Sequence, residues 1–122
     1  MERTRMKEKE LCSRLFRFAV DNIRMLKKIG SSSSLNVIKF QLTKSATSSG
    51  ANYEEAQAAC SRADFLNKVR ISLKEMRESN YWLRILSDLE LSNKKEIESL
   101  VNESVELKNI LGSISKNASA NS

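Results

Sequence analysis

Two rows of basic side chains form the clearest chemical pattern in this sequence. One row lies between residues 14 and 28, and the other lies between residues 70 and 84 and includes a tyrosine. Steps of three, four and seven residues place each row on one face of a helix, where cations about one turn apart can follow a phosphate backbone. A tyrosine in such a row can stack on a base. The rows are Arg14, Arg17, Arg24 and Lys28, and Arg70, Lys74, Arg77, Tyr81 and Arg84.

Net charge agrees with this pattern but does not decide between two interpretations. The formal net charge is +6, and residues 1–29 hold nine Lys or Arg against four acids. One interpretation is binding of RNA or DNA through the basic helix faces. The other is a structural or protein-interaction scaffold, in which the Arg/Lys rows form salt bridges between subunits or face solvent.

Catalysis is not expected from this composition. The sequence has no His and only two Cys, so the commonest general base and the commonest metal ligand are missing. A carboxylate pair built from Glu55 and Glu75 is conceivable, but no Gly-rich phosphate loop or metal motif accompanies it. We expect a protein that is not an enzyme and has neither a cofactor nor a metal.

Long helices must carry these residues. There is no Pro and there are only three Gly in 122 residues, and apolar residues recur at steps of three and four. The pattern predicts helices over about 7–29, 34–59, 61–90 and 93–116, with both tails frayed. Helices of similar length joined by short turns predict one all-α domain over residues 1–122, an antiparallel up-down-up-down four-helix bundle.

Several residues have the types that begin or end helices. Gly30 follows the first predicted helix and is expected to cap its C-terminus. One of Ser32 to Ser34 is expected to cap the second helix, and Ser61 with Asp64 the third. Asn93, followed by Glu96, resembles a capping box for the fourth helix.

The segment "TKSATSSGANYEEAQAACSRADF", residues 43–65, has a loop-like composition and a helix-like spacing. A seam of steps of three and four runs through it without a slip, from Leu35 to Ala59. We expect a continuous helix there, and the alternative is a break near residues 48–50.

Small polar residues on that seam must find partners if they are buried. We expect Ser45, Ser49 and Asn52 to face Glu75, with Glu55 nearby, as one hydrogen-bonded cluster between the second and third helices. Ser72 and Ser79 share the face of Glu75. In the alternative interpretation these groups face solvent or a neighbouring subunit.

Residues 42–86 also resemble the signature of the bacterial 23S rRNA intervening-sequence proteins, a four-helix-bundle family. The segment "RLFRFAVDNIRMLKKI", residues 14–29, is similar to the family's first helix. The matching elements are Asn52, Glu55 and Ala56, then Ser61, Asp64 and Phe65, then Lys74, Glu75, Glu78, Tyr81, Trp82 and Leu83.

The resemblance implies a homo-oligomer, a pentamer with subunits arranged around a central channel. The architecture is also remotely similar to the accessory variability proteins of diversity-generating retroelements. That similarity implies nucleic acid and a reverse-transcriptase-type protein as partners.

Cellular location follows from two features of the sequence. No apolar run approaches 18 residues, so no membrane span is expected. The first 16 residues are too charged for a secretory signal, and two distant cysteines are typical of a reduced compartment. We therefore expect a cytoplasmic protein.

Overall fold

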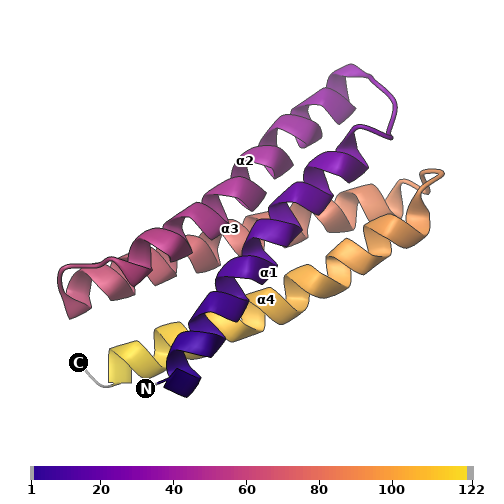
Figure 1. Cartoon of the computed structure of the whole chain (residues 1–122). Coiled ribbons are helices and arrows are strands. Elements are labelled where there is room, and N and C mark those ends of the chain that lie inside the picture. The colour runs from indigo at the N-terminus through magenta and orange to yellow at the C-terminus, as the bar shows by residue number, and fades with distance from the viewer. Residues whose placement is uncertain (1, 121–122) are drawn as a thin grey trace.

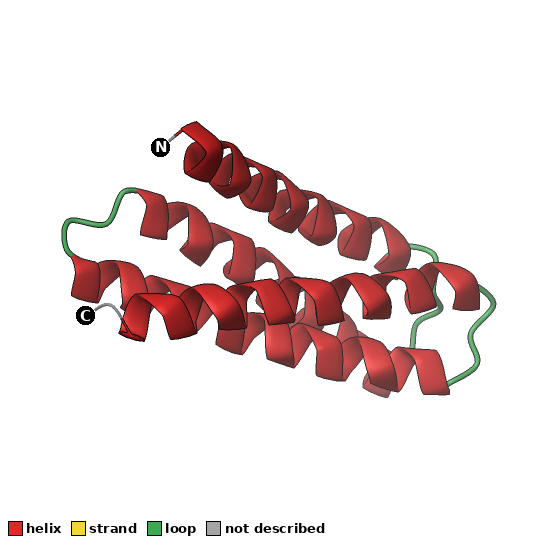
Figure 2. Ribbon diagram, turned by 90° about the horizontal axis from the view of Figure 1, so that it is seen from below, coloured by secondary structure: helices red, strands yellow, loops and turns green. Residues whose placement is uncertain are grey.

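The computed structural model describes the backbone of residues 2–120 and the side chains of residues 7–120. It contains four helices: α1 (Glu2–Leu26), α2 (Ser33–Gln57), α3 (Arg62–Asp88) and α4 (Lys94–Ala120). Consecutive helices run in opposite directions, and both ends of the chain lie at the same end of the molecule (Figures 1 and 2).

Each helix packs against two others, so the four helices close into a bundle. The contacting pairs are α1–α2, α2–α3, α3–α4 and α1–α4, which leaves α1 and α3 on one diagonal and α2 and α4 on the other. This arrangement confirms the predicted all-α up-down bundle. Within the described residues, no helix is both long and apolar enough to cross a membrane.

The core is the apolar stripe that the three-and-four spacing predicts. Each helix contributes fully buried side chains at successive turns, because only one side of each rod faces the bundle axis. These side chains include Leu15, Phe18 and Met25 of α1, Leu42 and Ala46 of α2, Val69, Met76, Leu83 and Leu86 of α3, and Ile97, Leu107 and Leu111 of α4.

Residues 43–57 are helical without a break, as the spacing predicted, although the helix ends at Gln57 and not at residue 59. Helix α2 passes through residues 48–50 without a break, and Ser45 and Ser49 are fully buried. Gly50 faces α1, where a Cβ atom added to it would lie 3.4 Å from Leu15 Cβ. The small residues therefore bring α2 close to both of its neighbours.

Two of the expected helix caps are present. The Ser32 hydroxyl accepts a hydrogen bond of 3.1 Å from Leu35 N, and the Ser61 hydroxyl accepts one of 3.0 Å from Asp64 N. The Asp64 carboxylate in turn accepts from Cys60 N at 3.4 Å. Both caps satisfy helix N–H groups that have no partner within the helix.

The expected Asn93–Glu96 capping box is wrong. The amide group of Asn93 is buried and has no hydrogen-bond partner among the described residues. Glu96 extends instead to Lys28, in the turn after the neighbouring helix α1, 3.1 Å away. Glu96 therefore pairs with the turn after α1 and does not cap its own helix.

The helix ends also differ from prediction. Helix α1 ends at Leu26, and Gly30 does not have the positive φ of a left-handed cap; in the described chain only Glu90 does, with φ 54°. Helix α4 continues to Ala120, so the tail expected to fray after residue 116 is helical. The tail lines one side of a groove, and the first turns of α1 line the other side. Helix α1 therefore gives the tail a neighbouring surface. Residues 1, 121 and 122 lie outside the described backbone.

Candidate nucleic-acid interface

The basic row of α3 lies on the solvent-facing side of that helix. Helix α3 turns its apolar faces toward α2 and α4, which leaves a stripe of exposed side chains between them. Arg70, Lys74, Arg77 and Arg84 are all exposed on this stripe. Among the side chains that the structure describes, no carboxylate forms an ion pair with any of these four. The row is therefore available to a phosphate backbone.

Tyr81 and Arg84 form a contact at one end of this row. Tyr81 is 50% exposed, and its ring forms an edge-to-face contact with Trp82, with centroids 5.1 Å apart and planes at 70°. The Arg84 guanidinium lies 5.7 Å from the centre of the Tyr81 ring. This is a cation–π contact on an exposed aromatic ring.

The basic row of α1 is divided. Arg14 donates two hydrogen bonds to the Glu103 carboxylate, of 3.0 Å through Nε and 2.7 Å through Nη2, and also approaches Glu106 at 3.5 Å. The hydrogen bond to Glu103 raises the pKa of Arg14. Lys28 pairs with Glu96. Arg14 joins α1 to α4, and Lys28 joins the turn after α1 to the same helix, so both charges already have a carboxylate partner within the chain.

The two remaining members of that row, Arg17 and Arg24, are exposed. Arg17 lines a polar groove between α1 and α4 whose other charged members are mostly acids. The negative charges of these acids would repel phosphate. The acids are Asp21, Glu98, Glu103 and Glu106. Since α1 and α3 lie on a diagonal, the structure does not join the two predicted rows into one basic face.

The serines of the predicted polar cluster are brought together between α2 and α3. Ser45 Oγ and Ser79 Oγ share a hydrogen bond of 2.8 Å. Ser49 and Ser72 lie opposite one another, with their hydroxyl oxygens 3.2 Å apart. All four side chains are fully buried, and all are hydrogen-bonded.

The other three members of the predicted cluster lie elsewhere. Asn52 turns back along α2 and donates to Ser48 O at 2.9 Å. Glu55 is exposed and pairs with Lys68 at 3.4 Å. The Glu75 carboxylate forms no hydrogen bond or ion pair among the described residues, and only its backbone carbonyl takes part, as the acceptor for Ser79. The expectation that these residues face one another is therefore wrong.

The Glu75 carboxyl nevertheless has a perturbed titration. Its pKa is raised, chiefly because it is partly buried and also because Glu78 is close, while Lys74 and Lys44 act in the opposite direction. Burial without a hydrogen-bond donor disfavours the charged form.

A chain of hydrogen bonds behind Arg84 was not anticipated. Arg84 Nε donates to Asn80 Oδ1 at 2.9 Å, and Asn80 Nδ2 donates to Ser104 Oγ at 2.9 Å. The Ser104 hydroxyl donates to Val101 O at 2.7 Å. The signal was present in the sequence, because Asn80 falls on the buried step between Met76 and Leu83.

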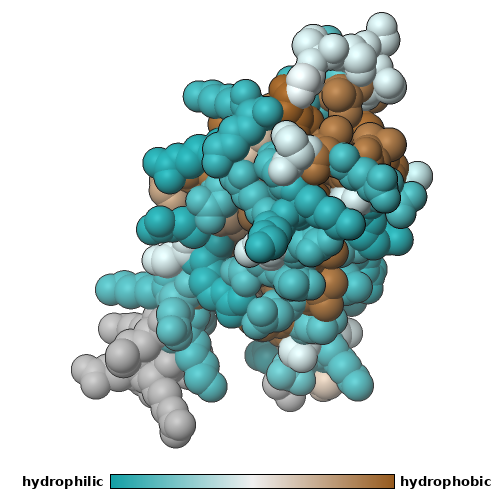
Figure 3. All heavy atoms as spheres, turned by 90° about the vertical axis from the view of Figure 1, so that its right-hand side faces the viewer, coloured by the Kyte–Doolittle hydropathy of each residue, from teal (hydrophilic) through white to brown (hydrophobic). Residues whose placement is uncertain are grey.

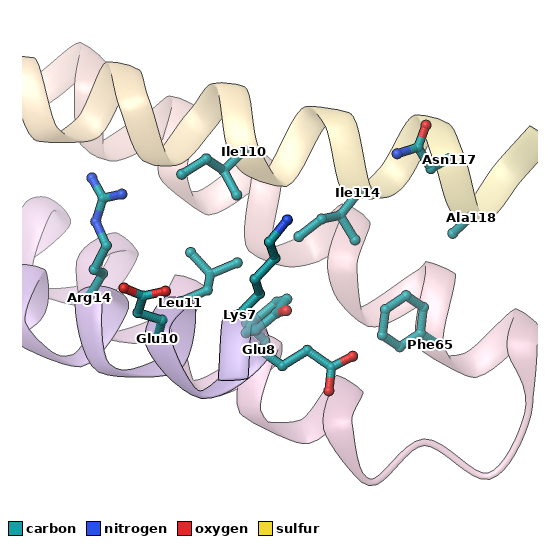
Figure 4. Close-up of a pocket in the computed structure, with 11 residues that line it drawn as sticks. Lys7, Glu8, Glu10, Leu11, Arg14, Phe65, Ile110, Ile114, Asn117 and Ala118 are labelled. Carbon is teal, nitrogen blue, oxygen red and sulfur yellow. The ribbon is translucent and has the colours of Figure 1, made fainter. Parts of the chain in front are cut away.

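A groove between α1 and α4 was also not anticipated. It has a volume of about 600 Å³, and its lining includes Leu11, Phe65, Ile110 and Ile114 (Figure 4). Charged side chains from the first turns of α1 stand at its edge, among them Lys7 and Glu8. No group of three or more metal-binding side chains occurs in the described part of the chain.

These features define a class of protein: an antiparallel four-helix bundle with a hydroxyl-lined helix interface and one unpaired basic helix face. Residues 7–113 match the family described as 23S rRNA-intervening sequence protein, and the chain belongs to this family.

A solved structure agrees with that assignment. It is the crystal structure of a protein with unknown function from the S23 ribosomal protein family of Bacteroides thetaiotaomicron. This chain is 38% identical to it, with a TM-score of 0.80, and the alignment covers 90% of this chain and 98% of the other. No match to a curated protein was found.

Proposed function

We propose that this protein is a non-enzymatic, self-associating helical bundle that binds nucleic acid through the exposed face of α3. The observation that carries the proposal is the row of Arg70, Lys74, Arg77 and Arg84, whose charges no carboxylate of the described side chains neutralises through an ion pair. In α1, by contrast, Arg14 is already paired within the subunit.

The length of the row suits a phosphate backbone. From Arg70 to Arg84 the helix rises about 21 Å, at about 1.5 Å per residue. Phosphates along one strand of a duplex advance by about 3.4 Å each, so the row spans about six of them. Asp88, one turn beyond Arg84, ends the row with a negative charge. Several weak contacts of this kind add together when identical subunits present the same row.

Salt dependence of RNA binding tests the proposal. We expect the affinity for a labelled RNA fragment to fall steeply as salt rises, because binding releases counterions. The variant with Arg70→Ala, Lys74→Ala and Arg77→Ala should bind more weakly, and its slope of log affinity against log salt should be smaller by about two to three.

A matched control separates a local contact from overall charge. Lys95→Ala, Lys108→Ala and Lys116→Ala together remove the same charge from α4, and none of these lysines forms an ion pair in the described structure. The control should keep its affinity and slope. Equal loss in both triple variants would show that only net charge matters, and unchanged binding in the α3 variant would remove α3 as the contact.

Self-association is proposed through the outer side of α1 and α2. Phe16 of α1 and Phe40 of α2 are each 66% exposed, and Val37 is 57% exposed. A groove between the two helices is lined largely by apolar side chains, including Val20 and Ile23. Figure 3 shows hydrophobic side chains at the surface near the α1–α2 turn. Such a patch costs free energy in water and fits a second copy of the chain.

The mass of the assembly tests this part. Phe16→Glu with Phe40→Glu should reduce the mass measured by sedimentation, while Leu89→Glu, at a 49% exposed residue outside the patch, should not. An unchanged mass would exclude this face. If instead the α3 triple variant dissociates the assembly, the basic row serves subunit contacts, and the scaffold interpretation replaces nucleic-acid binding.

A further inference from the structure

We infer that Tyr81 and Arg84 form a stacking site for an unpaired base, so that α3 selects single-stranded nucleic acid over duplex. The inference rests on the proposed function and names the substrate class of the same face.

The ring of Tyr81 is held in place and is still accessible. Its ring packs against Trp82 in an edge-to-face contact with centroids 5.1 Å apart, and half of the residue remains exposed. An exposed ring with a fixed orientation loses little conformational entropy when a base stacks on it. Every base has a π-face, so such a site accepts any sequence.

Arg84 is held by a chain of hydrogen bonds, here called the relay, that reaches into the bundle. Its Nε group donates to Asn80, which is only 7% exposed and which in turn donates to Ser104 of α4. The relay uses Nε and leaves the two Nη groups without a hydrogen bond in the described structure. The guanidinium plane can therefore stack on a base or bind a phosphate while it remains near the Tyr81 ring.

Neighbouring charges complete the site. Arg77 lies four residues before Tyr81, and Lys74 lies one turn further along the same stripe. A strand whose base stacks at Tyr81 can place its following phosphates on these two cations, since residues three and four apart are neighbours on a helix. The combination of an aromatic ring with a line of cations is the usual composition of a single-strand site.

A duplex cannot use the ring in the same way. Its bases are stacked on one another, and the major groove of an RNA helix is too deep and narrow for side chains to enter. Helix α3 is flanked by α2 and α4, so these two helices prevent its exposed side chains from entering deeply into a groove of the duplex. A duplex would therefore contact the cations alone.

The experiment compares probes with equal numbers of phosphates. Binding of a single-stranded RNA, a single-stranded DNA and a hairpin duplex is measured by fluorescence anisotropy at one salt concentration. Tyr81→Leu should weaken single-strand binding about tenfold and leave duplex binding unchanged, because one stacked base contributes on that scale. Tyr81→Phe keeps the ring and should keep the affinity.

Trp82 gives a second signal, because it is the single tryptophan of the sequence and touches Tyr81. Its fluorescence should change on addition of single strands and should not change with duplex. A thermal unfolding curve for Tyr81→Leu confirms that the variant is folded.

The possible results distinguish this inference from the proposed function. Absence of binding to all three probes would contradict both. Equal affinity for single strands and duplex, with no loss in Tyr81→Leu, would overturn the stacking site while phosphate binding by α3 stands.

Discussion

Ser49 and Ser72 each donate a hydrogen bond to the backbone carbonyl of the other. Ser49 Oγ lies 2.8 Å from Ser72 O, and Ser72 Oγ lies 2.7 Å from Ser49 O. The pair joins α2 to α3 at a fully buried position, and its two bonds fix the helices in one register. A sliding motion along either helix would break both bonds at once, and burial makes unpaired hydroxyl groups costly.

Removal of either hydroxyl should destabilise the fold. We expect Ser49→Ala and Ser72→Ala each to lower the free energy of unfolding by about 1 kcal/mol, the usual net value of a buried hydrogen bond. Urea denaturation measures the change. Ser113→Ala, at an exposed helical position, gains the same helix propensity without losing a bond and is the control. A Ser49→Ala protein as stable as that control would contradict the structural role of the pair.

Gly50 offers a contrasting substitution. A Cβ atom there would make ordinary van der Waals contact with Leu15, and φ at Gly50 is not positive. Gly50→Ala should therefore stabilise the protein by about 0.5–1 kcal/mol, because alanine loses less backbone entropy in a helix.

Gly112→Ala is the matched control for Gly50, because nothing lies within 4 Å of its added Cβ. Both variants should gain helix propensity, and the difference between them measures the contact with Leu15. Destabilisation by Gly50→Ala alone would show that α1 and α2 need the closer approach that glycine allows.

Glu75→Gln should change how stability depends on pH. Burial raises the pKa of Glu75 in the folded protein, so its protonated form favours folding. That contribution is present below the unfolded-state pKa and is lost as pH rises through the folded-state pKa. Glutamine, which stays neutral, should therefore be more stable than wild type at neutral pH, and the gain should vanish in acid.

Urea denaturation between about pH 4 and about pH 8 covers this range, because an unperturbed Glu titrates near the lower limit. The charged groups that face Glu75 are Glu78, Lys74 and Lys44, and they are unchanged in the variant. Glu54→Gln replaces an exposed carboxyl of α2 and is the control. Lower stability of Glu75→Gln at neutral pH would mean that the carboxylate has a favourable partner after all.

Among the residues of the described chain other than glycine, Glu90 alone has a positive φ, of 54°. A side chain in this left-handed conformation costs about 1 kcal/mol relative to glycine. Glu90→Gly should therefore raise the midpoint of thermal unfolding. Ser92→Gly lies in the same turn without positive φ and should lower it, because the new glycine adds flexibility to the unfolded chain without relieving strain. Two variants of equal stability would argue against strain at this turn.

The sequence predicted the helices well because the spacing of apolar residues along each helix reflects which side of that helix is buried. Phe18 and Leu42 fall on apolar stripes, and Ser45 and Ser49 continue one of those stripes despite their polar side chains. A residue that faces the bundle axis can be recognised because apolar residues lie three and four positions before and after it. Helix continuity through Gly50 could therefore be predicted without knowledge of its contacts.

The partners of long charged side chains could not be predicted in the same way. Whether Arg14 is paired depends on Glu103, which lies 89 residues away on a helix whose rotation the pattern of α1 does not determine. Glu75 shares a face with Ser72 and Ser79, yet its longer side chain leaves the seam, and only its carbonyl remains there. Short side chains stay where the backbone places them, and long ones do not.

The ion pairs that residues 14 and 28 form with α4 have a consequence for how the bundle folds. Arg14 of α1 meets Glu103, and Lys28, just after the end of α1, meets Glu96, so both cations find their partners only in α4. Before α4 is in place, α1 can pack only against α2, and the bundle is open along the side that α4 covers. Closure of this side therefore depends on the contacts of longest sequence separation in the bundle, such as the contact between Arg14 and Glu103, which lie 89 residues apart.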